Sequence, residues 1–428
     1  MKTVIRLAIA AALFGSLSTL AFGQPVFTIV KVPNSVPDTL TGINDSGVVL
    51  DNDGTSTSRT VSEWGLQTGS TPVELTGQNN TGAAINSAGE IAGAGTEAGS
   101  TNEQAFVWRP SNGVHWLGTL GNFPSAANAI SSSGAVVGIS HNAAQQTHAF
   151  LWTDAAGMQD LTPELTSPLG SIATGINSSN EAVGYYHPYE GATVYGFTWT
   201  EAGGLQNFGP PGTLPMAITD SGTIIGQSPN SAGLKHAFSW TLSGGFVDLG
   251  TLGGDSSVAL ASNNKGWIVG TSLTGATTGQ IFHGFLWTPS GGMQDFTTLA
   301  NMSKGQQVYS VAVNDFGDIA VSTDSHLQVL VPKMTATAVS SVNPSVAEQP
   351  VTFTVTLSSI AGAPPDGETI EVSESGTVYG TATLEGGVAQ VTLNGMKAGS
   401  HPITVTYNGD AYYLSFRAIA ITQVVNPQ

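Results

Sequence analysis

Residues 129–152 read AISSSGAVVGISHNAAQQTHAFLW, and variants of this stretch recur along the chain. The stretch contains an Ala/Ile segment, a polar turn with glycine, a β-branched run and an aromatic segment that ends in Trp. Short runs of this kind between Gly, Ser and Asn clusters predict antiparallel strands. The recurrence decides the fold, because a fixed period of 20–50 residues is the signature of repeat architectures.

The polar turn occurs seven times, and its central position is almost always glycine. The seven positions are Gly47, Gly89, Gly134, Asn180, Gly222, Gly266 and Gly317, at successive spacings of 42, 45, 46, 42, 44 and 51 residues. Asn is the natural substitute where the backbone needs a positive φ, so we expect left-handed backbone there. Each unit carries about four strand signals, which predicts one blade of a β-propeller.

The strand count also predicts how the ring closes. The seventh unit ends at HLQVLVP, 326–332, without a fourth strand, whereas VFTIVKVP, 26–33, precedes the first turn as an extra one. We therefore expect residues 26–33 to complete the last blade of a seven-bladed propeller spanning 24–333. Closure removes a free sheet edge that would promote aggregation. The Ala/Gly-rich first strands suit the crowded axis, and the Phe/Trp strands suit the spaces between blades.

Several of these segments carry a family resemblance. HAFLW at 148–152, HAFSW at 236–240, HGFLW at 283–287 and DLGTLGG at 248–254 resemble the HAF repeat family of bacterial extracellular proteins. The resemblance covers roughly residues 40–332. It implies an extracellular repeat protein and implies no activity. The first unit, with TVSEW, and the last, without Trp, depart from the pattern.

The last part of the chain, 334–428, has a different texture. VTFTVTL at 351–357 and HPITVTY at 401–407 alternate with period 2, which predicts half-buried strands. Seven strand candidates in this segment predict an immunoglobulin-like β-sandwich. The segment also resembles the bacterial Ig-like repeat domains of exported proteins. We identify no amphipathic helix in either part.

The first residues predict export. Lys2 and Arg6 flank the start of an apolar run, Leu7–Phe14, and small residues near Gly23 fit a cleavage site. Residues 1–23 are therefore interpreted as a signal peptide, and the mature protein as extracellular or attached to the cell surface. A membrane anchor is the alternative, but the apolar run is short, and no later stretch is long enough to span a bilayer.

Composition excludes some partners and chemistries. The chain has no cysteine, so it has no disulfide, thiol nucleophile or thiolate metal site. Lys plus Arg number 11 and Asp plus Glu 29, a formal charge of −18. This field repels nucleic acids and anionic membranes, so neither is an expected partner.

The polar positions of the repeat are interpreted as structural. His148, His236, His283 and His326 share one repeat position, which Thr60, Gln104 and Tyr195 occupy in other units. Equivalent positions in different blades lie too far apart to bind one metal ion, so we expect hydrogen bonds to neighbouring loops. Residues 51–54, DNDG, resemble a calcium loop only faintly and are expected to form a polar loop. The turn residues are attributed to turn chemistry alone; they are Asn44, Asn86, Asn177, Asp220, Asn264 and Asn314.

One segment is a candidate binding site. YYHPYEGATVY, 185–195, places aromatic side chains where the other units carry Ser, Ala and Gly. Exposed tyrosines stack on sugar rings or anchor a protein partner. The candidate residues are Tyr185, Tyr186, His187, Tyr189 and Tyr195. Packing over a blade edge is the alternative.

Three functions fit these observations. The first is a binding or adhesion protein for carbohydrate or a surface protein, with no catalytic residue, metal or cofactor. The second is a propeller enzyme acting on polysaccharide, which requires acidic or His side chains converging at a channel mouth. The third is a structural surface-coat component. A channel lined by Ala, Ser and Gly would favour binding, and the sequence leaves the oligomeric state open.

Overall fold

The computed structural model describes residues 25–33, 35, 40–55, 58–66, 68–167, 169–275, 281–410 and 412–428. The predicted signal peptide, 1–23, lies outside these residues and stays a prediction. None of the helices in the described part has the length and apolar character needed to cross a membrane.

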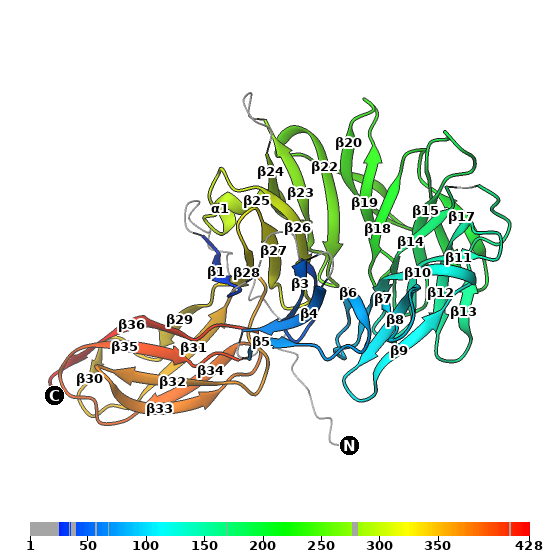
Figure 1. Cartoon of the computed structure of the whole chain (residues 1–428). Coiled ribbons are helices and arrows are strands. Elements are labelled where there is room, and N and C mark those ends of the chain that lie inside the picture. Colours follow the sequence, from blue (N-terminus) through cyan, green and yellow to red (C-terminus); the bar gives the residue numbers. More distant parts are fainter. Residues whose placement is uncertain are drawn as a thin grey trace, which may run out of the picture.

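Seven four-stranded antiparallel sheets form the blades of a propeller (Figure 1). Blades 1 and 2 contain β2 (Leu40–Ile43), β3 (Val48–Thr55), β4 (Ser58–Gly65), β5 (Gly69–Pro72), then β6 (Gln78–Ile85), β7 (Ile91–Thr96), β8 (Glu103–Arg109), β9 (Gly113–Gly118). Blades 3 and 4 contain β10 (Gly121–Ile130), β11 (Val136–Asn142), β12 (Thr147–Thr153), β13 (Gly157–Asp160), then β14 (Ser171–Ile176), β15 (Ala182–Tyr186), β16 (Tyr195–Thr200), β17 (Gly204–Phe208).

The remaining blades follow the same order. Blades 5 and 6 contain β18 (Leu214–Ile218), β19 (Ile224–Pro229), β20 (Lys235–Thr241), β21 (Gly245–Gly250), then β22 (Gly253–Ser262), β23 (Ile268–Thr274), β24 (Phe282–Thr288), β25 (Gly292–Asp295). One helical turn, α1 (Phe296–Leu299), follows β25 where the sequence predicts no helix. Blade 7 combines β26 (Val308–Val313), β27 (Ile319–Thr323) and β28 (Leu327–Pro332) with β1 (Phe27–Lys31).

The first strand of each unit lies innermost, as the small residues predict. Each of these strands contacts the first strands of both neighbouring blades, and β26 contacts β2, so the ring is closed. A Cβ atom added at Gly175 would lie 3.0 Å from the Cα of Ala217 in the next blade. The turns also follow the prediction: φ is 82° at Gly134 and 60° at Asn180, so Asn replaces glycine in left-handed backbone.

Closure by the N-terminal strand is confirmed. β1 pairs antiparallel with β28, from Phe27 opposite Pro332 to Lys31 opposite Gln328. The Phe27 side chain is 1% exposed and packs edge-on against Trp267 of blade 6, with ring centroids 6.3 Å apart. Backbone bonds from Val26 N to Leu299 O and from Lys333 N to Val26 O extend the junction.

Replacing Phe27 by Ala tests this junction. Removing a buried Phe ring costs about 3–5 kcal/mol, because the lost apolar contacts leave a cavity. We expect the free energy of unfolding of the propeller to fall by this amount in chemical denaturation of residues 24–428. Leu242→Ala is the control, since Leu242 is 90% exposed and its loss is expected to change stability by less than about 0.5 kcal/mol. Equal stability of the two variants would contradict the closure.

The C-terminal segment forms the predicted β-sandwich, drawn in orange and red beside the ring (Figure 1). One sheet contains β29 (Thr335–Ser340), β31 (Val351–Ser358) and β34 (Val388–Leu393); the other contains β30 (Ser345–Val346), β36 (Phe416–Asn426), β35 (Gly399–Tyr407), β32 (Thr369–Glu374) and β33 (Thr377–Thr383). The sandwich has one strand more than predicted. The additional strand is β30, which has only two residues and therefore gives no clear signal in the sequence. Alternate residues of β31, including Phe353 and Val355, are fully buried.

The sandwich packs against the turns of blades 6 and 7. Phe316 stacks on Tyr412 with ring centroids 3.7 Å apart, and Lys265 Nζ donates to the carbonyl of Ala361 at 3.1 Å. Asp318 is fully buried beside this contact, and its Oδ2 accepts from Asn314 Nδ2 at 3.1 Å. Burial raises the pKa of Asp318 to about 7; the hydrogen bond from Asn314 opposes this shift and the nearby charge of Asp410 adds to it.

Asp318 therefore makes stability depend on pH. Between about pH 4 and pH 7 the folded protein keeps a proton that the unfolded chain has released, so the free energy of unfolding falls as pH rises through this window. We expect Asp318→Asn to resemble the wild type at low pH and to be the more stable protein at pH 8. The gain is bounded by about 4 kcal/mol, because the pKa rises from its ordinary value of 3.8 to about 7.

Denaturant titrations at pH 5 and pH 8 measure this difference. The control is Asp255→Asn, because Asp255 is exposed near the start of β22. If the wild type were as stable as Asp318→Asn at pH 8, burial would not destabilise the charged form of the Asp318 carboxylate, and the prediction would be wrong.

Candidate functional site

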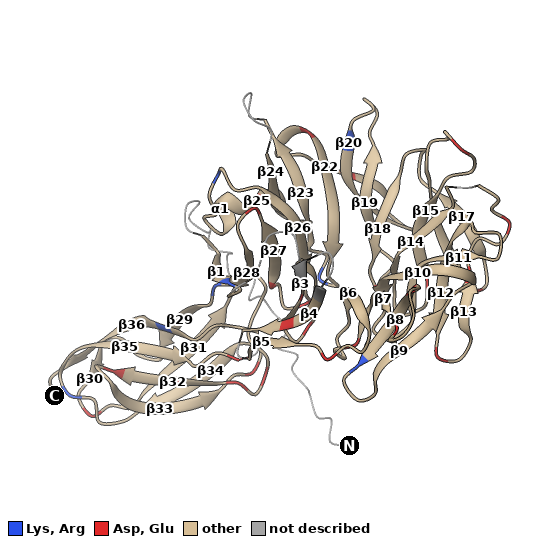
Figure 2. Ribbon diagram, in the orientation of Figure 1, with Lys and Arg blue, Asp and Glu red and all other residues tan. Residues whose placement is uncertain are grey.

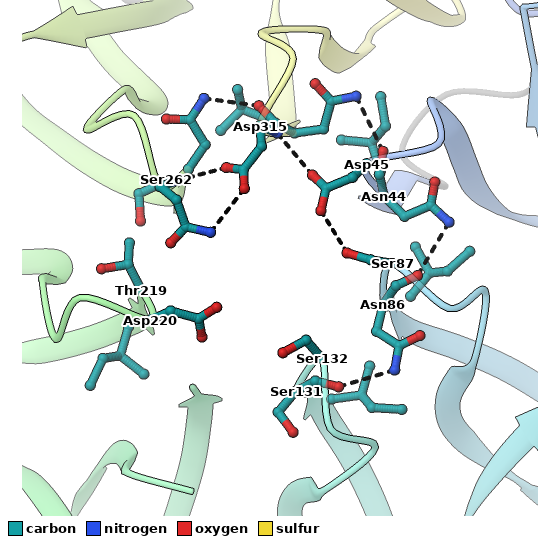
Figure 3. Close-up of a pocket in the computed structure, with 18 of the residues that line it drawn as sticks. Asn44, Asp45, Asn86, Ser87, Ser131, Ser132, Thr219, Asp220, Ser262 and Asp315 are labelled. Atoms are coloured by element: carbon teal, nitrogen blue, oxygen red, sulfur yellow. Dashed lines mark hydrogen bonds between the residues drawn. The ribbon is translucent and has the colours of Figure 1, made fainter. Parts of the chain in front are cut away.

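The turns that follow the seven innermost strands meet around the propeller axis. They enclose a polar cavity of about 190 Å³ (Figure 3). Its wall combines the last residues of the inner strands, such as Ile43 and Ile130, with polar turn residues. The turn residues that line the cavity are Asn44, Asp45, Asn86, Ser87, Ser131, Ser132, Thr219, Asp220, Asn263, Asn264, Asn314 and Asp315.

In five of the seven blades the first turn residue is an asparagine that connects its blade to the next one. Asn44 Oδ1 accepts from the backbone of Ser46 and Val48 within its own turn, while its Nδ2 donates to the carbonyl of Asn86 in blade 2. The same link joins Asn86 to Ser131, Asn177 to Thr219, Asn263 to Asn314 and Asn314 to Asn44, at 3.0, 3.4, 2.9 and 3.2 Å. Turn chemistry alone is therefore an incomplete explanation, since these amides also join blades.

Ser131 and Thr219 occupy the same position without this link. Ser131 Oγ accepts from Ala135 N, and Thr219 Oγ1 accepts from Thr223 N, so each hydroxyl closes its own turn. A hydroxyl lacks the amide group that reaches the neighbouring carbonyl. Five Asn links and two Ser/Thr turns thus surround the axis.

Replacing Asn263 by Ser separates the two roles of this side chain, which are to close its own turn and to bond the next blade. The hydroxyl can still close the turn, as Ser131 does, but the 2.9 Å bond to the carbonyl of Asn314 is lost. The Asn314 carbonyl keeps the hydrogen bond from the backbone N–H of Gly317 at 3.2 Å. The expected fall in the free energy of unfolding is therefore the net value of one hydrogen bond, about 0.5–1.5 kcal/mol. Ser46→Ala is the control, because Ser46 is exposed in the corresponding turn of blade 1. A neutral Asn263→Ser change would show that the amide link does not stabilise the ring.

Two carboxylates meet at the mouth of this cavity. Asp45 Oδ1 accepts from the backbone N–H of Asp315 at 2.9 Å, and its Oδ2 accepts from the Ser87 hydroxyl at 2.6 Å. Asp315 in turn accepts from the backbone and side chain of Asn264 at 2.7 and 2.9 Å. The convergence matches one requirement of the enzyme hypothesis. Both carboxylates, however, already accept hydrogen bonds from adjacent turns, so they are not a free acid pair of the kind that the enzyme hypothesis needs. The cavity wall also differs from the Ala, Ser and Gly lining that would favour the binding hypothesis.

A His–Asp pair recurs between the third and fourth strands of three blades. His148 Nδ1 contacts Asp160 Oδ2 at 2.7 Å, and its Nε2 contacts the carbonyl of Leu165 at 3.0 Å. His283 repeats both contacts with Asp295 Oδ2, at 2.8 Å, and the carbonyl of Lys304, at 3.0 Å. The predicted hydrogen bonds to neighbouring loops are therefore confirmed for these two residues.

The other two histidines of this column differ. His236 Nδ1 contacts Asp248 at 3.0 Å, but its Nε2 is buried without a hydrogen-bond partner among the described residues. Blade 5 has no long loop at this point, because β22 begins at Gly253, three residues after β21 ends. His326 Nε2 is also buried without a partner among the described residues, so this nitrogen does not make the predicted bond to them.

The predicted tyrosine cluster separates into different environments. Tyr186 and Tyr195 are opposite each other on β15 and β16 and stack with centroids 6.0 Å apart, and the Tyr186 hydroxyl donates to Asn207 Oδ1 at 2.8 Å. Tyr185 is the neighbour of Tyr186 on β15, so its side chain points to the opposite face of the blade.

The remaining two residues of the cluster lie in the loop after β15. Tyr189 is 67% exposed. His187 donates its backbone N–H to Gly170 O, and its Nδ1 is buried without a described partner. The structure therefore brings Tyr186 and Tyr195 together but does not gather all five residues.

Tyr186 lines a groove between blades 3 and 4 with a volume of about 550 Å³. We call this cavity the blade 3–4 groove. Its apolar wall contains Leu161, Leu165, Tyr186, Trp199 and Leu205, and its polar groups include Gln159, Asp160, Glu164 and Glu201. Sequence reasoning missed the contribution of blade 3. The signal was the long segment LTPELTSPLG, 161–170, between β13 and β14.

The DNDG segment is not the loop that the sequence predicts. Residues 51–54 lie within strand β3. The Asn52 side chain exchanges two hydrogen bonds of 2.9 Å with the backbone of Gly82 in blade 2. Within the described ranges, no group of three or more His, Cys, Asp or Glu residues is arranged to hold a metal ion.

Comparison with known proteins supports the domain types. Residues 336–426 match the family of the bacterial Ig-like domain (group 3), which shows that the C-terminal sandwich is of this kind. No curated protein has significant sequence similarity to the chain.

Solved structures with a similar fold include several β-propellers. A streptogramin B lyase is 14% identical, with a TM-score of 0.42, and the alignment covers 72% of this chain and 98% of that one. A gluconolactonase from Xanthomonas campestris is 10% identical, with a TM-score of 0.38 and coverage of 74% and 93%. TolB from Acinetobacter baumannii is 9% identical, with a TM-score of 0.38 and coverage of 72% and 96%.

Proposed function

We propose that this protein is an exported binding protein of the HAF-repeat type that holds carbohydrate in the blade 3–4 groove. The observation that carries the proposal is the composition of this groove. Tyr186 provides the main aromatic surface, to which the largely buried Trp199 adds a small part, and Gln159, Glu164 and Glu201 provide hydrogen-bonding groups around it. Concave sites with aromatic walls and a few polar groups are typical of small-ligand binding.

The groove has the right chemistry for a sugar ring. The C–H face of a sugar packs on aromatic surface, while its hydroxyls need acceptors and donors at the edges. Glu164 and Glu201 are exposed at the groove, so their carboxylates can accept hydrogen bonds from sugar hydroxyls in place of water. Stacking on Tyr195 and the bond to Asn207 hold the Tyr186 ring in place before a ligand binds.

The charge distribution favours neutral or cationic ligands at this groove. Acidic residues outnumber basic ones by 29 to 11, and both kinds are thinly scattered on a ribbon that is mostly uncharged (Figure 2). A neutral oligosaccharide avoids the repulsion that a polyanion would meet. In this proposal the sandwich serves as a spacer or tether at the cell surface.

The enzyme alternative places chemistry at the axial cavity instead. Asp45 and Asp315 are its candidates, because they meet at the cavity mouth. We favour binding because all four oxygens of these two carboxylates accept hydrogen bonds from neighbouring turns. The surface-coat alternative is less favoured because a coat component has no need of an aromatic groove.

Tyr186→Ala tests the proposed groove. A glycan array probed with residues 24–428 first identifies a bound sugar, and calorimetry then measures its affinity. Loss of the aromatic contact is expected to weaken binding about tenfold, which corresponds to about 1.4 kcal/mol. Tyr186→Phe keeps the ring and is expected to retain most of the affinity.

Tyr189→Ala is the matched control, because this tyrosine is 67% exposed and does not line the groove. Binding that weakens for Tyr189→Ala and not for Tyr186→Ala would move the site to the exposed loop. An array on which no glycan binds would reject the carbohydrate proposal.

A further inference from the structure

In blade 7 a lysine takes the position that an aspartate has in the His–Asp pairs of blades 3, 5 and 6. In blades 3, 5 and 6 the fourth strand places an aspartate opposite a phenylalanine of the third strand: Asp160 opposite Phe150, Asp248 opposite Phe238 and Asp295 opposite Phe285. In blade 7 the residue opposite the equivalent Gln328 is Lys31 of β1. His326 is therefore beside an ammonium group where the other histidines have a carboxylate.

The side chains around this position leave space rather than filling it. Lys31 and His326 line a cavity of about 620 Å³ together with Asn301, Ser303, Gln306 and Ser325. Gln306 Nε2 donates to Thr323 Oγ1 and Ser325 Oγ at 3.0 and 3.1 Å, which fixes this wall of the cavity. Within the described residues, His326 Nε2 has no hydrogen-bond partner although it is buried.

Lys31 places a positive charge near His326 in this cavity. Burial and the charge of Lys31 lower the pKa of His326, and Asp324 opposes this only in part. The cavity wall carries the Lys31 ammonium group, the His326 imidazole and the Asp324 carboxylate, in a protein whose net charge is −18. Hydroxyl and amide groups alone would not attract an anion into such a field, whereas a lysine with an adjacent imidazole can bind one.

We propose that this cavity binds a ligand carboxylate, which takes the place of the aspartate that blades 3, 5 and 6 supply from their own fourth strands. Lys31 Nζ pairs with the carboxylate, and the imidazole of His326 donates to it. The volume leaves room for a sugar-sized body behind the carboxylate, so a uronic acid is the ligand class that fits best. This site is separate from the blade 3–4 groove.

The test is a titration of residues 24–428 with D-glucuronate, followed by NMR of ¹³C-labelled histidine rings. The His326 signal is identified by its absence in His326→Gln. It is expected to shift and saturate with glucuronate, while neutral D-glucose leaves it unchanged. A second titration uses acetate, which has the carboxylate without the sugar ring. If acetate binds more weakly than glucuronate, the cavity also recognises the ring; if the two bind equally, it recognises the carboxylate alone. Equal shifts with glucose or with inorganic sulfate would overturn the proposal, as would no shift with glucuronate.

Two lysine variants complete the test. Lys31→Met keeps the length of the side chain and is expected to weaken glucuronate binding at least tenfold. Lys235→Met is the matched control, because Lys235 is an exposed lysine next to His236 on β20, the strand of blade 5 that corresponds to β28.

A third variant separates loss of binding from loss of folding. Lys31→Asp recreates the pair of the other blades, so the protein is expected to fold, to raise the pKa of His326 and to lose glucuronate binding. A folded Lys31→Asp protein that binds glucuronate as the wild type does would contradict the proposed role of Lys31. Tyr186→Ala is expected to leave this titration unchanged, so failure at the blade 3–4 groove and failure at this cavity are distinguishable.

Discussion

The pairing of β1 with β28 is the constraint on which the propeller depends. Without it, blade 7 would have three strands and an open edge, and Phe27 would leave the contact that it makes with Trp267 of blade 6. A ring of blades loses chain entropy over nearly 300 residues when it closes, and this cost grows only slowly with loop length. A few strong contacts at the junction can therefore hold the whole circle, which explains why a short strand of five residues suffices.

The same pairing explains why blade 7 is chemically different. In the other blades the fourth strand follows the third directly in the chain, so the His–Asp pairs of blades 3, 5 and 6 each lie within one repeat. In blade 7 the fourth strand comes from a segment outside the repeat, and it brings Lys31 to the acid position. The blade that closes the ring is thus free to carry another kind of side chain there, and its cavity gains an ammonium group without disturbing the repeated core.

Much of this fold could be predicted from the sequence, because its signals are local or periodic. The turn at Asn180 and the spare strand at 26–33 need only a pattern and a count. The link from Asn44 to the carbonyl of Asn86 could not be found in this way, since the two residues are 42 positions apart and meet only in the closed ring. Tyr185 and Tyr186 illustrate a second limit: adjacent letters in a motif point to opposite faces of a strand. The blade 3–4 groove likewise depends on residues from a loop of the preceding blade, and one repeat alone does not contain that information.

Loop length then decides where this protein has space for a ligand. Where a long loop follows the fourth strand, as in blades 3 and 6, its carbonyl occupies the histidine Nε2, and the loop also forms a wall of a neighbouring cavity. Where the connection is short, as in blade 5, the histidine keeps its aspartate but loses that cap. The repeated strands supply a constant framework, so a change confined to one connecting loop alters one cavity without affecting the others. A propeller built in this way carries several cavities of different chemistry between its blades on one ring.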